Sequence, residues 1–276
     1  MGLRVTTNMA SISAQRSLAT QAKKQEHASQ ALASGSRIVR AADDAAGLAI
    51  AEGMKSELRA TGAARSNAFN AISALQVGEG GLSEMTNLIT RIRELGVQSA
   101  SDTLGDKERV YLQQEAKSLS QEIDRISRTT KFGDKQLLDG SSAELEFHIG
   151  TTAAKENIIS FKVDGGVTSS DLNLDGVDIS SKSGARDVLS QTDKALEQVS
   201  RMRASFGSMQ SRLESTVNGL EVKNENLSAA RSRITDADVA KESSDLASST
   251  MLQNAAIGVL AQANQQPYAA MKLIGG

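Results

Sequence analysis

Residues 192–234 read TDKALEQVSRMRASFGSMQSRLESTVNGLEVKNENLSAARSRI, and this stretch decides the fold because apolar side chains recur in it every seven residues without a proline. One side of the repeat consists of Thr192, Val199, Phe206, Leu213, Leu220, Leu227 and Ile234. Such a repeat aligns these side chains in a narrow stripe along a long α-helix, and the stripe needs a second helix to cover it. The pattern therefore predicts a return helix over residues 185–235 that packs against another helix.

Two candidate partners for this helix lie in the first half of the chain. Residues 44–101 contain no proline and predict one helix of about 55 residues. A short break at residues 102–106 precedes a second apolar repeat, so the next helix is expected to run back antiparallel to the first. The apolar positions of the two repeats include Leu75, Leu82, Ile89, Leu112, Leu119 and Ile123.

Glycines inside the first predicted helix indicate close approach of a neighbour. Gly78 and Gly96 would let another helix come near, because they carry no side chain. The cluster at residues 78–81 lacks both the Gly-Lys-Ser/Thr end of a phosphate-binding loop and the spacing of a dinucleotide-binding fingerprint. We interpret it as a soft point or a tight helix crossing.

Aspartates mark two expected helix starts, at Asp43-Asp44 and at Asp236 and Asp238. A carboxylate at such a position accepts hydrogen bonds from free backbone N–H groups and suits the positive end of the helix dipole. Binding of a divalent metal by paired aspartates is the alternative. After the second start, a last helix is expected to run up to the only proline, Pro267.

The middle of the chain changes its period. Residues 144–149 and 159–163 alternate polar and apolar side chains, which predicts a β-hairpin at about residues 143–163. Residues 164–184 are rich in Gly, Ser and Asp and predict an exposed loop.

Composition excludes several classes of protein. The chain of 276 residues has no Cys, which rules out disulfides and thiolate metal sites, and its net charge of −2 argues against a nucleic-acid binder. His27 and His148 are its only histidines, and a helical rod offers no pocket for a catalytic triad, so we expect no catalytic residue, metal or cofactor site, and no small-molecule substrate. The N-terminus lacks the apolar core of a secretory signal, and we expect any export to proceed without a cleaved signal.

The expected fold is mainly α, a long antiparallel coiled-coil helical rod built from both chain ends with a small β-hairpin at its outer tip. Its expected parts are residues 1–43 and 236–276 as two halves of one helical domain, and residues 44–184 and 185–235 as the rod. The two chain ends must lie together if their apolar stripes are to bury one another.

Specific strings at both ends resemble the bacterial flagellin family. At the N-terminal end these are ASGSRI (33–38), AADDAAGLAIA (41–51), RIRELGVQSA (91–100) and EIDRI (122–126), and at the C-terminal end SRITDAD (232–238) and VLAQANQ (259–265). The resemblance covers roughly residues 1–140 and 185–276, in order.

The resemblance implies a structural subunit that polymerises into the secreted flagellar filament for swimming motility. Its terminal helices would form an inner tube, and the subunit would be exported unfolded through the flagellar secretion channel. The implied partners are further copies of the chain, a flagellin export chaperone, and the flagellar cap and hook–filament junction proteins. Positions matching the patch that the animal Toll-like receptor for flagellin recognises are Arg91, Leu95 and Glu115.

The apolar repeats are the expected polymerisation seam of such a subunit. The seam consists of Leu75, Leu82, Ile89, Leu112, Leu119, Ile123, Val199, Phe206, Leu213, Leu220, Leu227 and Ile234. Two alternatives remain at this point: a hook–filament junction protein, and a signalling coiled coil of the chemoreceptor kind.

Overall fold

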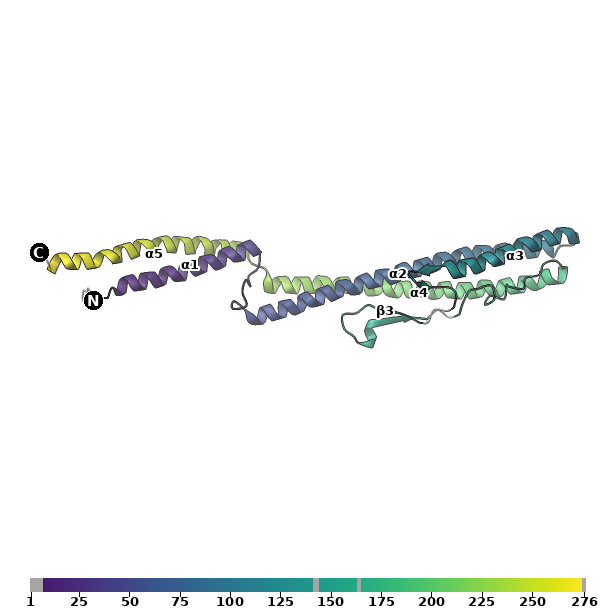
Figure 1. Cartoon of the computed structure of the whole chain (residues 1–276), viewed down its shortest axis with the longest axis horizontal. Helices are drawn as coiled ribbons and strands as arrows, with labels where there is room; N and C mark the ends of the chain where they lie inside the picture. Colours follow the sequence, from purple (N-terminus) through teal and green to yellow (C-terminus); the bar gives the residue numbers. More distant parts are fainter. Residues whose placement is uncertain (1–6, 141–143, 163–164, 275–276) are drawn as a thin grey trace. The chain divides into compact units, whose positions relative to one another are not determined.

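The computed structural model describes residues 7–140, 144–162 and 165–274, and it is mainly α-helical, as the heptad patterns predict. In chain order its elements are α1 (Met9–Ser34), α2 (Ala45–Ser99), α3 (Asp106–Thr129), β1 (Lys131–Phe132), β2 (Lys135–Gln136), β3 (Leu145–His148), the 3-10 turn η1 (Lys155–Asn157), β4 (Ile158–Phe161), α4 (Lys182–Thr235) and α5 (Val239–Ile274) (Figure 1).

Two compact units make up the chain. The terminal unit combines Met1–Leu58 with Asn226–Gly276, and the central unit is Arg59–Glu225. Helices α2 and α4 contribute to both units, so the division falls inside these helices and not at the capping signals where the sequence suggested domain limits. Each unit is described by itself below.

In the central unit, α2 and α4 run antiparallel. Arg65 of α2 pairs with Glu221 of α4 at 3.6 Å, and Arg93 pairs with Asp193 at 2.9 Å, so residue numbers rise along one helix while they fall along the other. The buried positions of the two heptad patterns face one another between these pairs and form the core.

Helix α3 folds back on α2, as the short break predicts. Arg109 is only 7 % exposed, and its guanidinium donates through Nη2 to the carbonyls of Ser101 and Leu104, at 2.9 and 3.2 Å. These bonds hold the tight turn between α2 and α3, and Arg91 of α2 reaches Glu115 of α3 across the pair.

The glycines of α2 mark tight crossings inside a continuous helix. A Cβ atom at Gly78 would collide with the Phe206 ring of α4, and one at Gly96 would lie 3.3 Å from Leu189 Cδ2. The Phe206 ring also meets Phe161 of β4 edge to face, with the ring centroids 5.0 Å apart. The tight-crossing interpretation of residues 78–81 is therefore confirmed at Gly78.

The predicted β-hairpin is present. Strands β3 and β4 pair antiparallel, with Leu145 opposite Phe161, while the predicted limits at residues 143 and 163 lie outside the described residues. The amide of Asn67 donates to the His148 carbonyl at 3.0 Å, so the hairpin lies beside α2 at this level of the central unit (Figure 1).

A second, shorter hairpin escaped prediction. Strands β1 and β2 have two residues each, and the turn between them contains Gly133 with a positive φ of 61°. Two-residue strands carry too little alternation to be recognised from the sequence.

The prediction that residues 164–184 form an exposed loop is wrong. Five apolar side chains of the described part of this segment are buried in the core of the central unit: Val167, Leu172, Leu174, Val177 and Ile179. They are spaced irregularly among Gly, Ser and Asp, so no periodic signal revealed them. The segment lies along α3 and contributes its apolar side chains to the core.

In the terminal unit, α1 and α5 pack along one another, and one aspartate of each predicted pair caps a helix, whereas Asp43 and Asp236 accept bonds from residues that precede them. Asp44 accepts from the Gly47 backbone N–H at 2.7 Å at the start of α2, and Asp238 accepts from Ala240 at 3.0 Å at the start of α5. The expected end of the last helix at Pro267 is wrong, because α5 continues through this proline to Ile274.

The crossing at Gly78 can be tested with a matched pair of alanine variants. Gly78→Ala should destabilise the chain, because the collision with Phe206, at a cost of about 1–3 kcal/mol, outweighs the gain of about 1 kcal/mol from better helix propensity. Gly80→Ala meets open space in the same helix turn and should be stabilising. Urea unfolding of the unpolymerised chain, followed by circular dichroism, measures both. Equal stabilisation by the two variants would contradict the tight crossing.

Candidate assembly interface

Most residues of the predicted polymerisation seam are covered within the chain itself. Buried residues are Leu75, Leu82, Ile89, Ile123, Val199, Phe206, Leu213 and Leu220, whereas Leu112, Leu119, Leu227 and Ile234 are half-buried. The eight buried side chains are core residues of one subunit. These eight are therefore not available to another copy, and the assembly role of the four half-buried residues stays a prediction.

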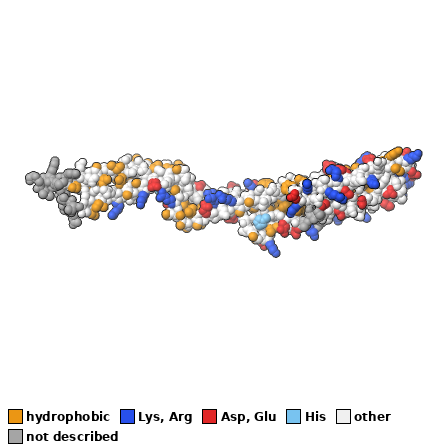
Figure 2. All heavy atoms as spheres, viewed as in Figure 1, with side chains coloured by type: hydrophobic (Ala, Val, Ile, Leu, Met, Phe, Trp, Pro, Cys, Tyr) orange, Lys and Arg blue, Asp and Glu red, His pale blue; other side chains and the backbone are white. Residues whose placement is uncertain are grey.

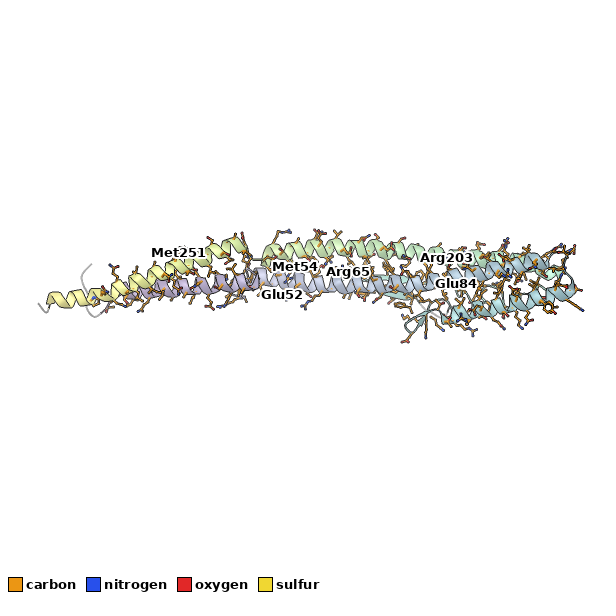
Figure 3. All side chains as sticks on the ribbon, turned by 90° about the horizontal axis from the view of Figure 1, so that it is seen from above. Glu52, Met54, Arg65, Glu84, Arg203 and Met251 are labelled. Carbon is orange, nitrogen blue, oxygen red and sulfur yellow. The ribbon has the colours of Figure 1, made fainter. Side chains whose placement is uncertain are left out.

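The terminal unit provides an exposed apolar surface. Large apolar side chains lie exposed along both of its helices, namely Met9 and Ile12 of α1 and Val239, Met251, Leu252, Ile257 and Val259 of α5. Met251 is 71 % exposed, and Figure 3 labels it on α5. Figure 2 shows apolar side chains spread over this pair of helices with few acids between them.

The C-terminal helix is also almost free of charge. No Asp, Glu, Lys or Arg occurs between Leu246 and Met271. The central unit differs, because basic and acidic side chains alternate over α3 and its neighbours (Figure 2). An uncharged helix with exposed Met, Leu, Ile and Val resembles the core of an interface more than a solvated surface.

Small side chains make up most of the contact between α1 and α5. Buried positions in these helices are Ser11, Ala14, Ala28, Ala31, Glu242, Ser249 and Ala263. Alanine and serine bury little apolar area, at about 25 cal/mol per Å². The pair therefore gains modest stability from its own packing and has apolar surface left over.

Hydrogen bonds join the two helices at intervals along their length. The Gln25 amide donates to Thr250 Oγ1 at 3.3 Å. Near the other end, the backbone N–H of Arg37 donates to the Thr235 carbonyl at 2.7 Å, and Ser36 Oγ donates to the same carbonyl at 3.0 Å. The connection after α1 is thus fastened to the junction of α4 and α5.

Two carboxylates stabilise these connections. Backbone N–H groups of Arg40 and Val39 donate to Asp43, with His27 at 3.3 Å, and the Arg40 bond is the largest cause of a lowered Asp43 pKa. The Ser232 and Thr235 hydroxyls donate to Asp236 and lower its pKa in the same way. Both carboxyls are therefore ionised throughout the neutral range.

In the central unit, one face of α3 binds the backbone of the segment that follows the hairpin. The Gln113 amide donates to the Val177 carbonyl at 2.7 Å and accepts from the Ile179 N–H at 2.6 Å. Seven residues further along α3, Ser120 Oγ donates to the Leu174 carbonyl, at 2.9 Å. These side chains satisfy backbone groups that have no strand partner, which lets an irregular segment enter the core.

The three predicted receptor contacts are not equally available. Arg91 and Glu115 are exposed and lie together, with Arg91 Nη2 2.8 Å from Glu115 Oε1, and this pairing raises the Arg91 pKa. Leu95 is only 1 % exposed because it belongs to the core. The folded central unit therefore offers the ion pair but not the leucine.

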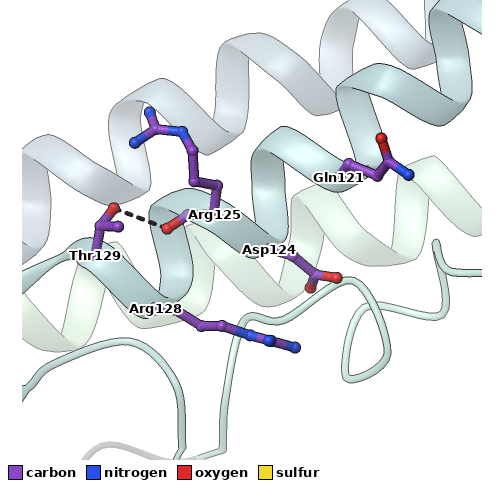
Figure 4. A pocket seen from close by; sticks show the side chains of 5 residues that line it. All are labelled: Gln121, Asp124, Arg125, Arg128 and Thr129. Atoms are coloured by element: carbon purple, nitrogen blue, oxygen red, sulfur yellow. Dashed lines mark hydrogen bonds between the residues drawn. The ribbon is translucent and has the colours of Figure 1, made fainter.

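A cavity of about 450 Å³ lies on α3 and is lined by Gln121, Asp124, Arg125, Arg128 and Thr129 (Figure 4). Asp124 accepts from the Ser169 N–H at 2.7 Å, and Arg125 is paired with Glu122 at 2.6 Å. Asp124 and Arg125 are thus bound to a neighbouring backbone group and to an ion-pair partner, and the lining residues do not place a nucleophile beside a base.

The expected absences can be stated only for the described part of the chain. Among those residues, no group of three or more His, Cys, Asp and Glu is placed to hold a metal ion. His27 lies near Asp43, and His148 is exposed on β3. None of the described helices combines the length and apolarity that crossing a bilayer requires.

Comparison with known proteins gives a consistent result over both ends of the chain. Residues 5–143 match the family model of the bacterial flagellin N-terminal helical region, and residues 189–274 match that of the bacterial flagellin C-terminal helical region. The chain is 37 % identical to a flagellin of Halalkalibacterium halodurans, over 97 % of this chain and 98 % of that protein. It is 35 % identical to a flagellin of Bacillus subtilis, over 99 % of this chain and all of that protein.

Solved structures share the fold. A crystal structure of Bacillus cereus flagellin superposes with a TM-score of 0.50 at 24 % identity, over 60 % of this chain and 94 % of that one. A putative flagellar hook-associated protein from Vibrio parahaemolyticus superposes with a TM-score of 0.59 at 14 % identity, over 70 % of this chain and all of that one. At these identities the likeness concerns the fold alone.

Acid should loosen the connections of the terminal unit in a defined direction. Because the folded pKa of Asp43 lies below its ordinary value of 3.8, its stabilisation is present above that value and is lost as the pH falls through the folded pKa. Asp43→Asn should lower the thermal midpoint at pH 5. The difference from the unmodified chain should close as the pH falls below about 3.8. A difference that stays constant from pH 5 to pH 2 would contradict this role of the carboxylate.

Proposed function

Because the chain belongs to the bacterial flagellin family, it is a structural subunit of the secreted flagellar filament, and we propose that its terminal unit carries the contacts that join subunits. The observation that supports this proposal is the uncharged, apolar surface left open on α1 and α5. Residues 1–43 and 236–276 together then build the inner tube of the filament. Neither alternative, a junction protein or a signalling coiled coil, is favoured by any observation.

The energetics of the helix pair explain why assembly and ordering go together. Ordering a residue costs about 1–2 kcal/mol of backbone entropy, and a contact of alanines and serines returns little of it. Side chains such as Ile257 at 51 % exposure and Val259 at 58 % contribute fully only when another copy covers them. Neighbouring subunits therefore complete the hydrophobic contact that one chain leaves unfinished.

The same surface explains the other partners of the proposal. Before export, an uncovered apolar α5 would aggregate or polymerise, so an export chaperone that covers it keeps the chain unfolded and transportable. At each end of a filament, no further copy covers the last subunit. There the cap protein at one end and the hook–filament junction protein at the other cover the apolar surface instead.

Recognition by the animal Toll-like receptor is proposed for the exposed pair Arg91 and Glu115, without a contact from the buried Leu95. Arg91→Ala should lower receptor signalling by purified monomer at least tenfold, because it removes a charged, exposed group from the proposed contact. Arg201→Ala removes a similarly exposed arginine from α4 and should leave the signal unchanged. A receptor-reporter cell assay measures both, and equal signals from the two variants would contradict the proposal.

Assembly is tested by removing or charging the terminal unit. Deletion of residues 1–40 or 240–276 should abolish filaments while circular dichroism still reports the helices of the central unit. A single Ile257→Asp change should also prevent polymerisation, because it places a charge in the proposed apolar contact without disturbing a buried position. Ile257→Leu is the matched control and should polymerise.

Electron microscopy after salt-induced polymerisation shows whether each of the four variants forms filaments. Filaments of normal appearance from either deletion, or from Ile257→Asp, would overturn the assignment of subunit contacts to the terminal unit.

A further inference from the structure

The proline inside α5 leaves one backbone carbonyl without its helical partner. In a regular helix the N–H of residue 267 would donate to the carbonyl of Ala263, four residues earlier, but Pro267 has no N–H. The chain contains one proline, so this carbonyl is the only one in the interior of α5 that loses its donor in this way. A carbonyl in a packed helix seam without a donor is costly.

A side chain from the opposite end of the chain supplies the missing donor. The Asn8 amide nitrogen donates to the Ala263 carbonyl oxygen at 2.7 Å. The carboxamide oxygen of Asn8 meanwhile accepts from the Ser11 backbone N–H at 3.1 Å and so caps the start of α1. One side chain thus uses both of its polar atoms, one on each helix.

A second bond stands beside the first. Ser11 Oγ donates to the Asn264 side-chain oxygen at 2.9 Å, and both Ser11 and Ala263 are buried. The first turn of α1 is therefore held to one particular turn of α5.

The rest of the α1–α5 seam cannot fix this alignment by shape. Its buried side chains are mainly alanine and serine, and such a seam accepts a slip of one helical turn with little loss of packing. In coiled coils a single buried polar side chain can specify the register when its partner is available in only one alignment.

We propose that Asn8 and Pro267 together set the axial register at one end of the α1–α5 pair, the end opposite to the Arg37–Thr235 and Gly35–Ala237 backbone bonds. Pro267 marks the Ala263 carbonyl as the one free acceptor, and the Asn8 amide selects it. In an alignment displaced by one turn, the Asn8 amide meets a carbonyl that already accepts a helical bond, and the Ala263 carbonyl is left without a donor. Asn8 is a positioning residue for assembly, an inference that rests on the proposed function.

The consequence concerns the polymer. Met251, Leu252 and Ile257 of α5 present an apolar surface whose position relative to α1 depends on this register. Identical subunits can build one regular lattice only if every subunit presents the same surface. A loss of register therefore raises the concentration of subunit needed for polymerisation.

The test is a double-mutant cycle on the full chain. Asn8→Asp keeps an oxygen that caps α1 but has no N–H to donate to the Ala263 carbonyl. It should raise the critical concentration for polymerisation on the order of tenfold, the effect of losing one buried hydrogen bond. Pro267→Ala restores an N–H to α5, so in that background Asn8→Asp should change the critical concentration less than threefold.

Asn218→Asp makes the same substitution at an exposed position of α4 in the central unit and is the matched control, expected to polymerise like the unmodified chain. An equal effect of Asn8→Asp in both backgrounds would overturn the register role and reduce Asn8 to a cap. If Pro267→Ala itself prevents polymerisation, hydrogen exchange of residues 9–14 is measured instead, in the unpolymerised form of all four chains of the cycle. Asn8→Asp should then speed exchange less in the Pro267→Ala background than in the unmodified one. Equal effects in both backgrounds would count against the proposal. Failure of the unmodified chain and of Asn218→Asp to polymerise would instead contradict the proposed function.

Discussion

The contact between α1 and α5 is the constraint on which the remaining structure depends. It brings residues from the two ends of the chain together through small side chains, so it can be close but cannot bury much area. Hydrogen bonds at Asn8, at Gln25 and at Arg37 supply the alignment that packing leaves open. The apolar surface that remains exposed is what a second copy of the chain can cover.

The central unit, unlike the α1–α5 pair, has a hydrophobic core of large side chains. Leucine, isoleucine and phenylalanine side chains from α2, α3 and α4 are buried together, and glycines bring α2 against α4 where Phe206 needs room. Its core residues are covered within one chain and do not need a neighbour to bury them. A filament subunit needs both properties, namely one stable unit and one that is completed by assembly.

Elements with a long regular period could be predicted from the sequence, whereas local departures from that period could not. The heptads predicted α2, α3 and α4, and the alternation at residues 144–149 predicted β3. The burial of Val167 and Leu174 was missed because it depends on α3 side chains that satisfy the backbone of an irregular segment. The passage of α5 through Pro267 was missed for the same kind of reason, since the compensating donor lies at the other end of the chain. Leu95 was misjudged as a surface residue because family resemblance gives positions and not exposure.

The decisive measurement is a reconstruction, at a resolution that shows side chains, of filaments assembled from the purified chain. In these filaments α1 and α5 of each subunit should be paired with the Asn8 amide at the Ala263 carbonyl, and neighbouring copies should cover Met251 and Ile257. Filaments in which these two side chains remain exposed to solvent, or in which α1 is displaced along α5 by a turn, would contradict this expectation.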